Sequence, residues 1–455
     1  GAARPPAAKA PNILVLFSDD QRFDTIHALG TPHIQTPHLD ALAARGTVFT
    51  NACIMGSTLP AVCAPSRAML LTGRSLFRLP ESMLHPGSTP PVSGPDPCPT
   101  YPEHLRTHGY RTFATGKWHN GKESLARGFD DGATIFFGGM TDHDKMHVFD
   151  FDPAGTYPQE KRLIGDRFSS ELFSDSVIRF LREYDADAPF LAYVAYTAPH
   201  DPRMPPEPYA RAYPPDRVPL PPNFLPEHPF DNGELRIRDK ELAPWPRTPE
   251  VVREHLAAYY GMITHLDAQV GRVLDALDET ERSGDTIVVF ASDNGLAIGS
   301  HGLLGKQNLY EHSVRVPLIL AGPGIPAGVR RDTLCYLHDL FPTLCGLAGT
   351  PALETSEGKS LAPALDDPAA TIRDSLFFAY RDVQRAVRTP RWKFARHEVG
   401  GRRTLQLFDL ENDPHECVNL AARVHHADRV EEMNALLRRW MTDVGDPCLA
   451  TWFGA

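Results

Sequence analysis

Asn12-Ile13-Leu14-Val15-Leu16-Phe17-Ser18-Asp19-Asp20 joins an apolar run to two adjacent carboxylates, and this stretch decides the fold. An uninterrupted apolar run of this length predicts a strand buried on both faces, as strands are in a parallel sheet. Adjacent carboxylates repel each other unless a cation lies between them, so Asp19 and Asp20 indicate a site for a hard divalent metal. The alternative is a solvated acidic pair on a surface loop, which the position directly after a buried strand disfavours.

Three more apolar runs have polar side chains directly after them. The runs and their polar groups are 110–115 with Gly116-Lys117-Trp118-His119, 190–196 with Pro199-His200, and 286–291 with Asp293-Asn294. In open α/β sheets, ligands bind at the carboxyl ends of the strands. If the four strands share one edge of a sheet, their polar ends form a single site.

Each polar group also has a structural interpretation when it is considered alone. Lys117 and His119 could belong to a charged loop, although side chains two apart on an extended chain point to the same side. His200 could cap a strand end, and it is also a candidate acid or base. The Asp293-Asn294-Gly295 run is typical of a turn. The common position after buried strands favours one functional site.

The run Cys63-Ala64-Pro65-Ser66-Arg67 continues through Thr72 to Gly73-Arg74. Pro65 suits a first helical position and Gly73 a helix end, so the pattern predicts a short helix with Cys63 just before it. Free N–H groups and the positive end of the dipole favour an anion there, and Arg67 is placed to reach the same spot. A buried core cysteine beside a helix cap is the alternative.

This Cys-x-Pro-Ser-Arg run, followed by Thr-Gly, resembles the signature of the formylglycine-dependent (type I) sulfatases of the alkaline phosphatase superfamily. In that family the cysteine is oxidised to an aldehyde, whose hydrate attacks sulfur. The resemblance covers most of residues 11–420. It implies that Cys63 is the precursor of formylglycine and that a formylglycine-generating or equivalent enzyme is a maturation partner.

The resemblance also implies the remaining ligands and catalytic groups. The implied cation is Ca²⁺, with Mg²⁺ as the alternative. Its implied ligands are Asp19, Asp20, Asp293, Asn294 and the modified Cys63. The implied sulfate-binding cations are Arg67, Lys117 and Lys306. The implied proton-transfer groups are Asp293 for the nucleophile, His119 for the diol and His200 for the leaving alcohol, with sulfate binding as the alternative role of His200.

The predicted fold is α/β, with a large mixed, mostly parallel sheet flanked by helices, similar to alkaline phosphatase. The 455 residues exceed the usual size of one hydrophobic core. Short strands separated by turns after residue 375, with a helix near 427–441, predict a smaller antiparallel sheet covered by one helix. The predicted division is a lead-in at 1–10, a catalytic domain at 11–374 and a C-terminal subdomain at 375–455.

Two segments, 128–150 and 202–249, together with the C-terminal subdomain at 375–455, are expected to contact the substrate. Residues 128–150 are predicted to be rich in loops, where Asp142, His143 or Lys145 either line a pocket or lie on a surface loop. The proline-rich residues 202–249 form a long excursion over the active-site face, and His301 is a weaker candidate for the pocket. We expect the helix after this excursion to begin at Thr248-Pro249 and to run to residue 277.

Composition limits the partners and the location. The net charge is −11 and no basic stripe is present, so a nucleic-acid partner is not expected. No apolar run reaches the length of a membrane span. No signal peptide is recognised in this chain, and the resemblance implies a periplasmic, secreted or lysosomal protein. The cysteines other than Cys63 are either disulfides or thiols, and the sequence leaves both open.

These observations predict a sulfatase that hydrolyses a sulfate monoester on a sulfated small molecule or glycan. A sulfated carbohydrate is expected because long irregular loops can frame a cleft of sugar size. One alternative is a phosphoester or phosphonate monoester hydrolase of the same superfamily. The other is a protein that binds sulfated glycans without turning them over.

Overall fold

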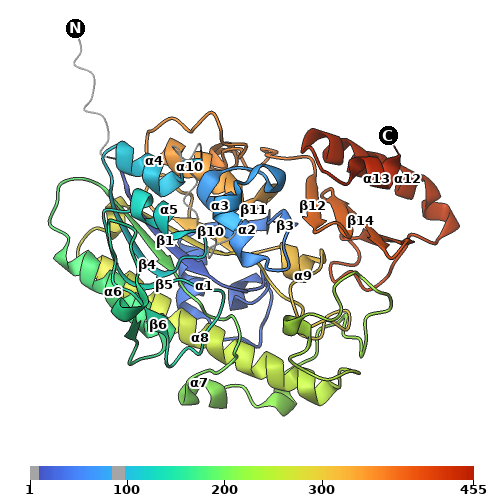
Figure 1. Ribbon diagram of the computed structural model, residues 1–455, viewed down its shortest axis with the longest axis horizontal. Helices are drawn as coiled ribbons and strands as arrows, with labels where there is room; N and C mark the ends of the chain where they lie inside the picture. The colour runs from blue at the N-terminus through green and yellow to red at the C-terminus, as the bar shows by residue number, and fades with distance from the viewer. Residues whose placement is uncertain (1–9, 85–97, 455) are drawn as a thin grey trace, which may run out of the picture.

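The computed structural model describes residues 10–84 and 98–454 (Figure 1). It has two main sheets, one large and one small, with helices on both faces of the large one, so the predicted α/β class is confirmed. The predicted lead-in at 1–10 lies outside the described residues except for residue 10. No helix within the described ranges combines the length and the apolar character that a membrane span needs.

The large sheet has eight strands in the order β11-β2-β10-β9-β1-β8-β4-β5. The strands are β1 (Asn12–Ser18), β2 (Gly46–Cys53), β4 (Arg111–Lys117), β5 (Asp131–Phe136), β8 (Phe190–Ala195), β9 (Thr286–Ser292), β10 (Leu318–Ala321) and β11 (Val329–Tyr336). Neighbours are parallel except at β10, which is antiparallel to both β9 and β2. The sheet is therefore mixed and mostly parallel, as predicted.

The strands β9, β1, β8 and β4 are consecutive neighbours and all run in the same direction. These are the strands that precede the polar groups identified in the sequence. Ser18 of β1 pairs with Ser292 of β9, and Gly116 of β4 pairs with Ala195 of β8. Their carboxyl ends consequently meet at one edge of the sheet, as the sequence predicted.

Both faces of the large sheet are covered, which explains the uninterrupted apolar runs. On one side lie α1 (Pro37–Ala44), α6 (Ser169–Glu183) and α8 (Pro249–Glu279), and on the other lie α2 (Cys63–Thr72), α4 (Tyr101–Thr107) and α10 (Leu340–Leu347) (Figure 1). Leu14 and Leu16 of β1 pack in the first core, whereas Val15 and Phe17 pack in the second. Thr248 caps α8 through the N–H of Val251, as predicted.

The C-terminal part forms the smaller sheet that the sequence predicted. Its strands are β12 (Leu376–Tyr380), β13 (Gln384–Arg388), β14 (Trp392–Val399) and β15 (Arg402–Asp409), all antiparallel. A short strand from the N-terminal half, β3 (Gly56–Ser57), adds to β12 in parallel and was not predicted. The sheet is covered by α12 (Ala427–Asp443) and followed by α13 (Leu449–Phe453). The boundary at residue 375 stays a prediction.

Two strands of the large sheet were missed by sequence reasoning. β5 lies within the segment expected to be loops, and β11 was not predicted. Both are edge strands with one neighbour, and neither is an uninterrupted apolar run, because β5 mixes polar and apolar residues and β11 contains the polar stretch 330–333. The remaining α-helices and β-strands are α3 (Glu81–Leu84), α5 (Lys122–Gly128), β6 (His147–Val148), β7 (Leu163–Ile164), α7 (Glu207–Arg211), α9 (Glu311–Val314) and α11 (Ala362–Asp366).

The cysteines that are free thiols include Cys53, Cys335, Cys345, Cys417 and Cys448.

Candidate active site

Three buried carboxylates meet where β1 and β9 end. Asp20 donates its backbone N–H to Asp293 Oδ1 at 3.0 Å, and Asn294 Nδ2 donates to Asp20 Oδ1 at 2.7 Å. Asp20 has a φ of 64°, a left-handed conformation that is uncommon for a residue other than glycine. This turn directs Asp19 and Asp20 into the same buried space as Asp293.

Each of the three carboxylates contacts a buried cation from another part of the chain. Lys117 Nζ lies 2.5 Å from Asp19 Oδ2, and Lys306 Nζ lies 2.6 Å from Asp20 Oδ1. Arg67 Nε lies 2.8 Å from Asp293 Oδ2. Charges buried this deeply are tolerated only when they are paired, so the three pairs connect the ends of β1 and β9 with α2, with the end of β4 and with the loop around Lys306.

The pKa values of the carboxylates diverge because their neighbours differ. Burial and the adjacent Asp19 raise the pKa of Asp293, although Arg67 acts against this. Burial also acts to raise the pKa of Asp19, but Lys117 and His200 outweigh it and hold that pKa below its usual range. Asp293 is thus the carboxylate of this pair that accepts a proton more readily.

Cys63 is the first residue of α2, not the residue before the helix as the sequence suggested. Val62 takes the cap position, and Pro65 is the third residue of the helix. Backbone N–H groups in the first turn have no partner within the helix, so the missing N–H of Pro65 costs no hydrogen bond there. The thiol is only 3% exposed and its Sγ lies 3.9 Å from Lys306 Nζ. Burial raises the pKa of the Cys63 thiol, while Lys117 and Lys306 act in the opposite direction.

Several oxygen atoms around Cys63 fit a divalent cation. Asp19 Oδ1 and Asn294 Oδ1 are buried and have no hydrogen-bond partner within residues 10–84 and 98–454. Ligand atoms of Asp19, Cys63 and Asp293 lie within 4.8 Å of one another, and so do those of Asp19, Asp20 and His200. Unpaired buried oxygens are costly, and carboxylate and amide oxygens are what hard cations bind. The acidic groups of this edge are therefore able to bind a metal ion.

Two histidines complete the cluster. His200 Nε2 lies 3.6 Å from Asp20 Oδ2, and its Nδ1 contacts the carbonyl of Asp201 at 2.8 Å. His119 is buried, and burial together with the nearby Lys117 and Arg67 holds its pKa well below the usual range. The structure thus brings together every residue predicted for the metal site and for catalysis.

The candidates from the flanking loops have different locations. Asp142 and Lys145 are exposed. His143 is buried, so it neither lines an open pocket nor lies on a surface loop. Its Nε2 contacts the carbonyl of His200 at 3.0 Å and its Nδ1 contacts Ser169 Oγ at 2.7 Å. His301 is not in the cluster, because its ring stacks on Tyr310 at 3.8 Å and contacts the carbonyl of Glu416.

Some residues next to the cluster were missed by sequence reasoning. Tyr259 of α8 hydrogen-bonds the backbone around Asp20, but an aromatic residue inside a long helix looks like any core residue. Arg238 pairs with Asp201. The only sequence signal for that pair was the position of Asp201 directly after His200.

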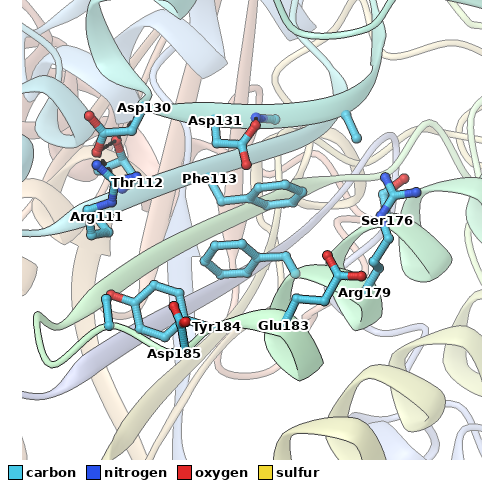
Figure 2. A pocket seen from close by; sticks show the side chains of 14 residues that line it. Arg111, Thr112, Phe113, Asp130, Asp131, Ser176, Arg179, Glu183, Tyr184 and Asp185 are labelled. Atoms are coloured by element: carbon cyan, nitrogen blue, oxygen red, sulfur yellow. Dashed lines mark hydrogen bonds between the residues drawn. The ribbon is translucent and has the colours of Figure 1, made fainter.

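A separate hollow of about 340 Å³ lies at the opposite edge of the large sheet, where β4 and β5 begin and α6 ends (Figure 2). Arg111, Asp131 and Tyr184 are among the side chains that line it, and the stacked rings of Phe113 and Phe180 lie 4.4 Å apart there. None of the residues predicted for catalysis lines this hollow. The polar cluster at the carboxyl ends of the strands remains the candidate active site.

Two family models match the chain. The sulfatase model covers residues 11–350, and the model of the N-sulphoglucosamine sulphohydrolase C-terminal region covers residues 299–443. The first match includes every residue of the candidate site. It extends over well more than half of the chain.

Individual relatives agree with these models. An ulvan-active sulfatase from Formosa agariphila is 29% identical over 96% of this chain and 82% of its own length. A choline-sulfatase from Rhizobium meliloti is 30% identical over 90% of this chain and 82% of its own. A solved structure bound to D-glucosamine-2-N,6-O-disulfate as its substrate shares the fold, with a TM-score of 0.79, 23% identity and coverage of 96% and 99%. The chain belongs to the sulfatase family and is a sulfuric ester hydrolase.

Proposed function

We propose that the protein hydrolyses a sulfate monoester of a carbohydrate, with formylglycine made from Cys63 as the nucleophile and with a bound divalent cation. One observation carries the proposal. The unpaired oxygens of Asp19 and Asn294 lie at the same buried edge as Cys63, and three cations surround them. Ca²⁺ is the proposed ion because all of its side-chain ligands other than residue 63 are oxygen donors, and Mg²⁺ is the alternative.

The carbohydrate substrate is supported by the relatives and by the loops. The Formosa agariphila relative is an ulvan-active sulfatase, and the similar solved structure holds a disulfated glucosamine. Asp239 of the long irregular segment 202–249 accepts a hydrogen bond from Gln307, the residue after Lys306 of the candidate site. A choline-sulfatase is equally similar in sequence, so the leaving alcohol is the part of the proposal that most needs an experiment.

In this proposal, Asp19, Asp20, Asp293, Asn294 and residue 63 hold the cation. When bound, it polarises a sulfate oxygen and lowers the pKa of the attacking hydroxyl. Asp293 accepts the proton of the nucleophile, in agreement with its raised pKa.

The cationic side chains stabilise the sulfuryl group. Lys117, Lys306 and Arg67 are buried around residue 63, where low solvent access strengthens their interaction with the developing negative charge. Because the three are fixed by ion pairs, they need little reorganisation during the reaction.

The histidines move protons at two different oxygens. His200 donates a proton to the sugar oxygen as the bond from sulfur to that oxygen breaks. His119 is the group proposed to take a proton from the second hydroxyl at residue 63 as sulfate leaves and the aldehyde returns. Burial and the nearby cations lower the pKa of His119, which favours the neutral form of the ring that this step requires.

The proposal includes a maturation enzyme that oxidises Cys63 and a periplasmic, secreted or lysosomal location, both supported by the family. The test begins with peptide mass spectrometry of residue 63 and with turnover of 4-nitrophenyl sulfate. We expect an aldehyde at residue 63 and a loss of turnover in Cys63→Ala. An unmodified thiol in fully active protein would contradict the proposed nucleophile.

The same assay separates the alternatives. A much higher kcat/KM for 4-nitrophenyl phosphate, or for a phosphonate monoester, than for the sulfate would favour the phosphoester or phosphonate hydrolase. Binding of sulfated glycans without any turnover by fully modified protein would favour the non-catalytic binder. Sulfate release from defined sulfated saccharides then identifies the substrate.

A further inference from the structure

We infer that Arg238 is a specificity-determining residue that binds hydroxyl groups of the sugar ring carrying the scissile sulfate. This inference rests on the proposed function and adds the group that recognises the leaving sugar. Arg238 begins the 3-10 helix η5 (Arg238–Lys240) inside the proline-rich excursion. It was not among the residues that the sequence singled out.

Arg238 is linked to the catalytic cluster through Asp201. Its Nη2 donates a hydrogen bond to Asp201 Oδ2, and Asp201 Oδ1 lies 3.4 Å from His200 Nδ1. His200 in turn lies 3.6 Å from Asp20 Oδ2. The guanidinium is therefore two contacts away from the group proposed to protonate the leaving oxygen.

A second set of contacts ties the same segment to the other side of the cluster. Arg238 Nη1 donates to Asp239 Oδ1 at 3.3 Å, and Gln307 Nε2 donates to Asp239 Oδ2 at 2.7 Å. Gln307 follows Lys306, which binds Asp20 Oδ1. Together these contacts form a closed ring of side chains. Asp20 lies at its buried end and Arg238 at its opposite end, and the two ends are connected through His200 on one side and Lys306 on the other.

The exposure of the side chains indicates that the Arg238 end of this ring is accessible to a ligand. The Arg238 side chain is 43% exposed, whereas its partner Asp201 is only 5% exposed. A guanidinium carries five N–H donors, and its two bonds to carboxylates fix the plane while part of the group still faces solvent. A fixed donor fork of this kind loses little conformational freedom when a ligand binds.

The charges of this group favour hydroxyls over a second anion. Arg238 and the nearby Arg203 balance Asp201 and Asp239, so the four side chains carry no net charge. They offer donors and acceptors side by side, which suits the hydroxyls of a sugar ring. An aryl ring or a trimethylammonium group has no hydroxyl and so cannot exchange hydrogen bonds with these side chains.

The experiment compares kcat/KM for 4-nitrophenyl sulfate with kcat/KM for D-glucosamine 6-sulfate, D-galactose 6-sulfate and their N- or 2-O-sulfated counterparts. In Arg238→Ala we expect the ratio of saccharide to aryl sulfate efficiency to fall about 10- to 100-fold, since hydrogen bonds to a substrate hydroxyl are lost. Arg238→Lys keeps a positive charge for Asp201 but lacks the planar fork, so its ratio should be intermediate. The loss should appear mainly in KM if the hydroxyls are bound equally in the ground state.

Arg236 is the matched control, because it is an exposed arginine of the same segment whose guanidinium lies 4.4 Å over the ring of Trp245. Arg236→Ala should leave the ratio unchanged. Equal losses on both substrate types in Arg238→Ala, or an equal fall in the ratio in Arg236→Ala, would overturn the inference. So would a wild type that hydrolyses 4-nitrophenyl sulfate but no saccharide of the set.

Failure of the proposed function gives a different result, namely a modified wild type that hydrolyses neither the aryl sulfate nor any saccharide. Thermal unfolding of each variant shows whether it is folded. A folded Arg238→Lys with an unchanged ratio contradicts the inference even if Arg238→Ala unfolds.

Discussion

Tyr259 donates a 2.6 Å hydrogen bond from its phenol hydroxyl to the backbone carbonyl of Asp20. The same hydroxyl accepts a 2.9 Å hydrogen bond from the N–H of Arg22. One side chain on α8 thereby satisfies the buried backbone on both sides of Gln21. Asp20 is in a left-handed conformation, which costs on the order of 1 kcal/mol. The two bonds help to maintain that conformation and with it the direction of the Asp20 carboxylate.

Tyr259→Phe is predicted to weaken metal binding more than folding. Without the hydroxyl, the Asp20 carbonyl and the Arg22 N–H stay buried and unpaired, at a cost of about 1 to 3 kcal/mol. Part of this cost disappears if the turn relaxes and the Asp20 carboxylate moves, so the affinity for Ca²⁺ should fall about tenfold. Calcium titration followed by thermal unfolding measures both effects.

Tyr260→Phe serves as the control for this variant. Tyr260 is the next residue of α8 and its ring packs against Tyr213 at 5.8 Å, whereas the hydrogen bonds to the backbone around Asp20 are made by Tyr259. It should bind Ca²⁺ like the wild type. Equal calcium affinity in Tyr259→Phe and wild type would show that the hydroxyl does not position Asp20.

Removal of the metal is predicted to lower stability and abolish turnover. Without a cation, Asp19, Asp20 and Asp293 repel one another and the Asp19 Oδ1 and Asn294 Oδ1 atoms stay unpaired. A ligand that binds only the folded state at 100 times its Kd adds about 2.7 kcal/mol. The unfolding temperature should therefore fall with a chelator and recover with Ca²⁺.

Asp19→Asn tests whether this gain comes from the candidate site. The variant keeps the size of the side chain but removes one charge, so most of the calcium-dependent rise in unfolding temperature should disappear. Asp332→Asn, an exposed acid on β11, should retain the rise. A full rise in Asp19→Asn would place the ion elsewhere.

The C-terminal helices are predicted to depend on one buried ion pair. Arg385 of β13 binds Asp446 through two nitrogen atoms, with Nη2 at 2.9 Å from Oδ1, and both side chains are fully buried. Asp446→Ala leaves the guanidinium without its counter-charge, and we expect a loss of about 3 to 5 kcal/mol in the free energy of unfolding. Denaturant titration measures this loss.

An exposed pair of α12 provides the comparison. Glu432 contacts Arg429 at 2.6 Å on the surface of the helix, and Glu432→Ala should change stability by less than about 0.5 kcal/mol. Similar losses in both variants would mean that burial does not decide the contribution of these pairs.

Acidification is predicted to destabilise the fold in part through His301. Burial lowers the pKa of His301 to about 4, and the nearby His228 and Lys393 act in the same direction. Below the unfolded-state pKa of about 6.5, the unfolded chain binds a proton that the folded ring does not. The stability due to this neutral ring is complete above pH 6.5, decreases as the pH falls toward 4, and amounts to at most about 3 kcal/mol.

His301→Gln should therefore show a shallower loss of unfolding free energy between pH 6.5 and 4 than the wild type. His108 is an exposed residue directly after α4, with its ring 4.4 Å from that of His104, and His108→Gln serves as the control. Parallel pH curves for wild type and His301→Gln would contradict the assignment.

The central strands and the polar groups after them could be predicted because both follow from the same burial. β1, β8 and β9 are covered on both faces, so their sequences are apolar without interruption, and a charged residue directly after such a run has to be paired or bind a ligand. This physical link is why Asp19, His200 and Asp293 were recognised from the sequence.

Other features have no comparable sequence pattern. β3 has two residues and exists only because β12 supplies its partner, while the edge strand β5 has one neighbour and a mixed polarity. His143 was ambiguous because its role depends on a contact with His200, 57 positions along the chain. Long-range contacts of single side chains are set by the packing of whole elements, which local sequence does not specify.

The pairing of β3 with β12 also bears on the order of events during synthesis. Gly56 and Ser57 precede the Cys63 helix and are held by Ala379 and Tyr380, which the ribosome adds more than 300 residues later. Until those residues arrive, the segment before Cys63 lacks its partner strand, and afterwards the thiol is almost inaccessible. An enzyme that has to bind an extended chain around this thiol can therefore do so only before folding is complete, while the polypeptide is still being synthesised or has just been released.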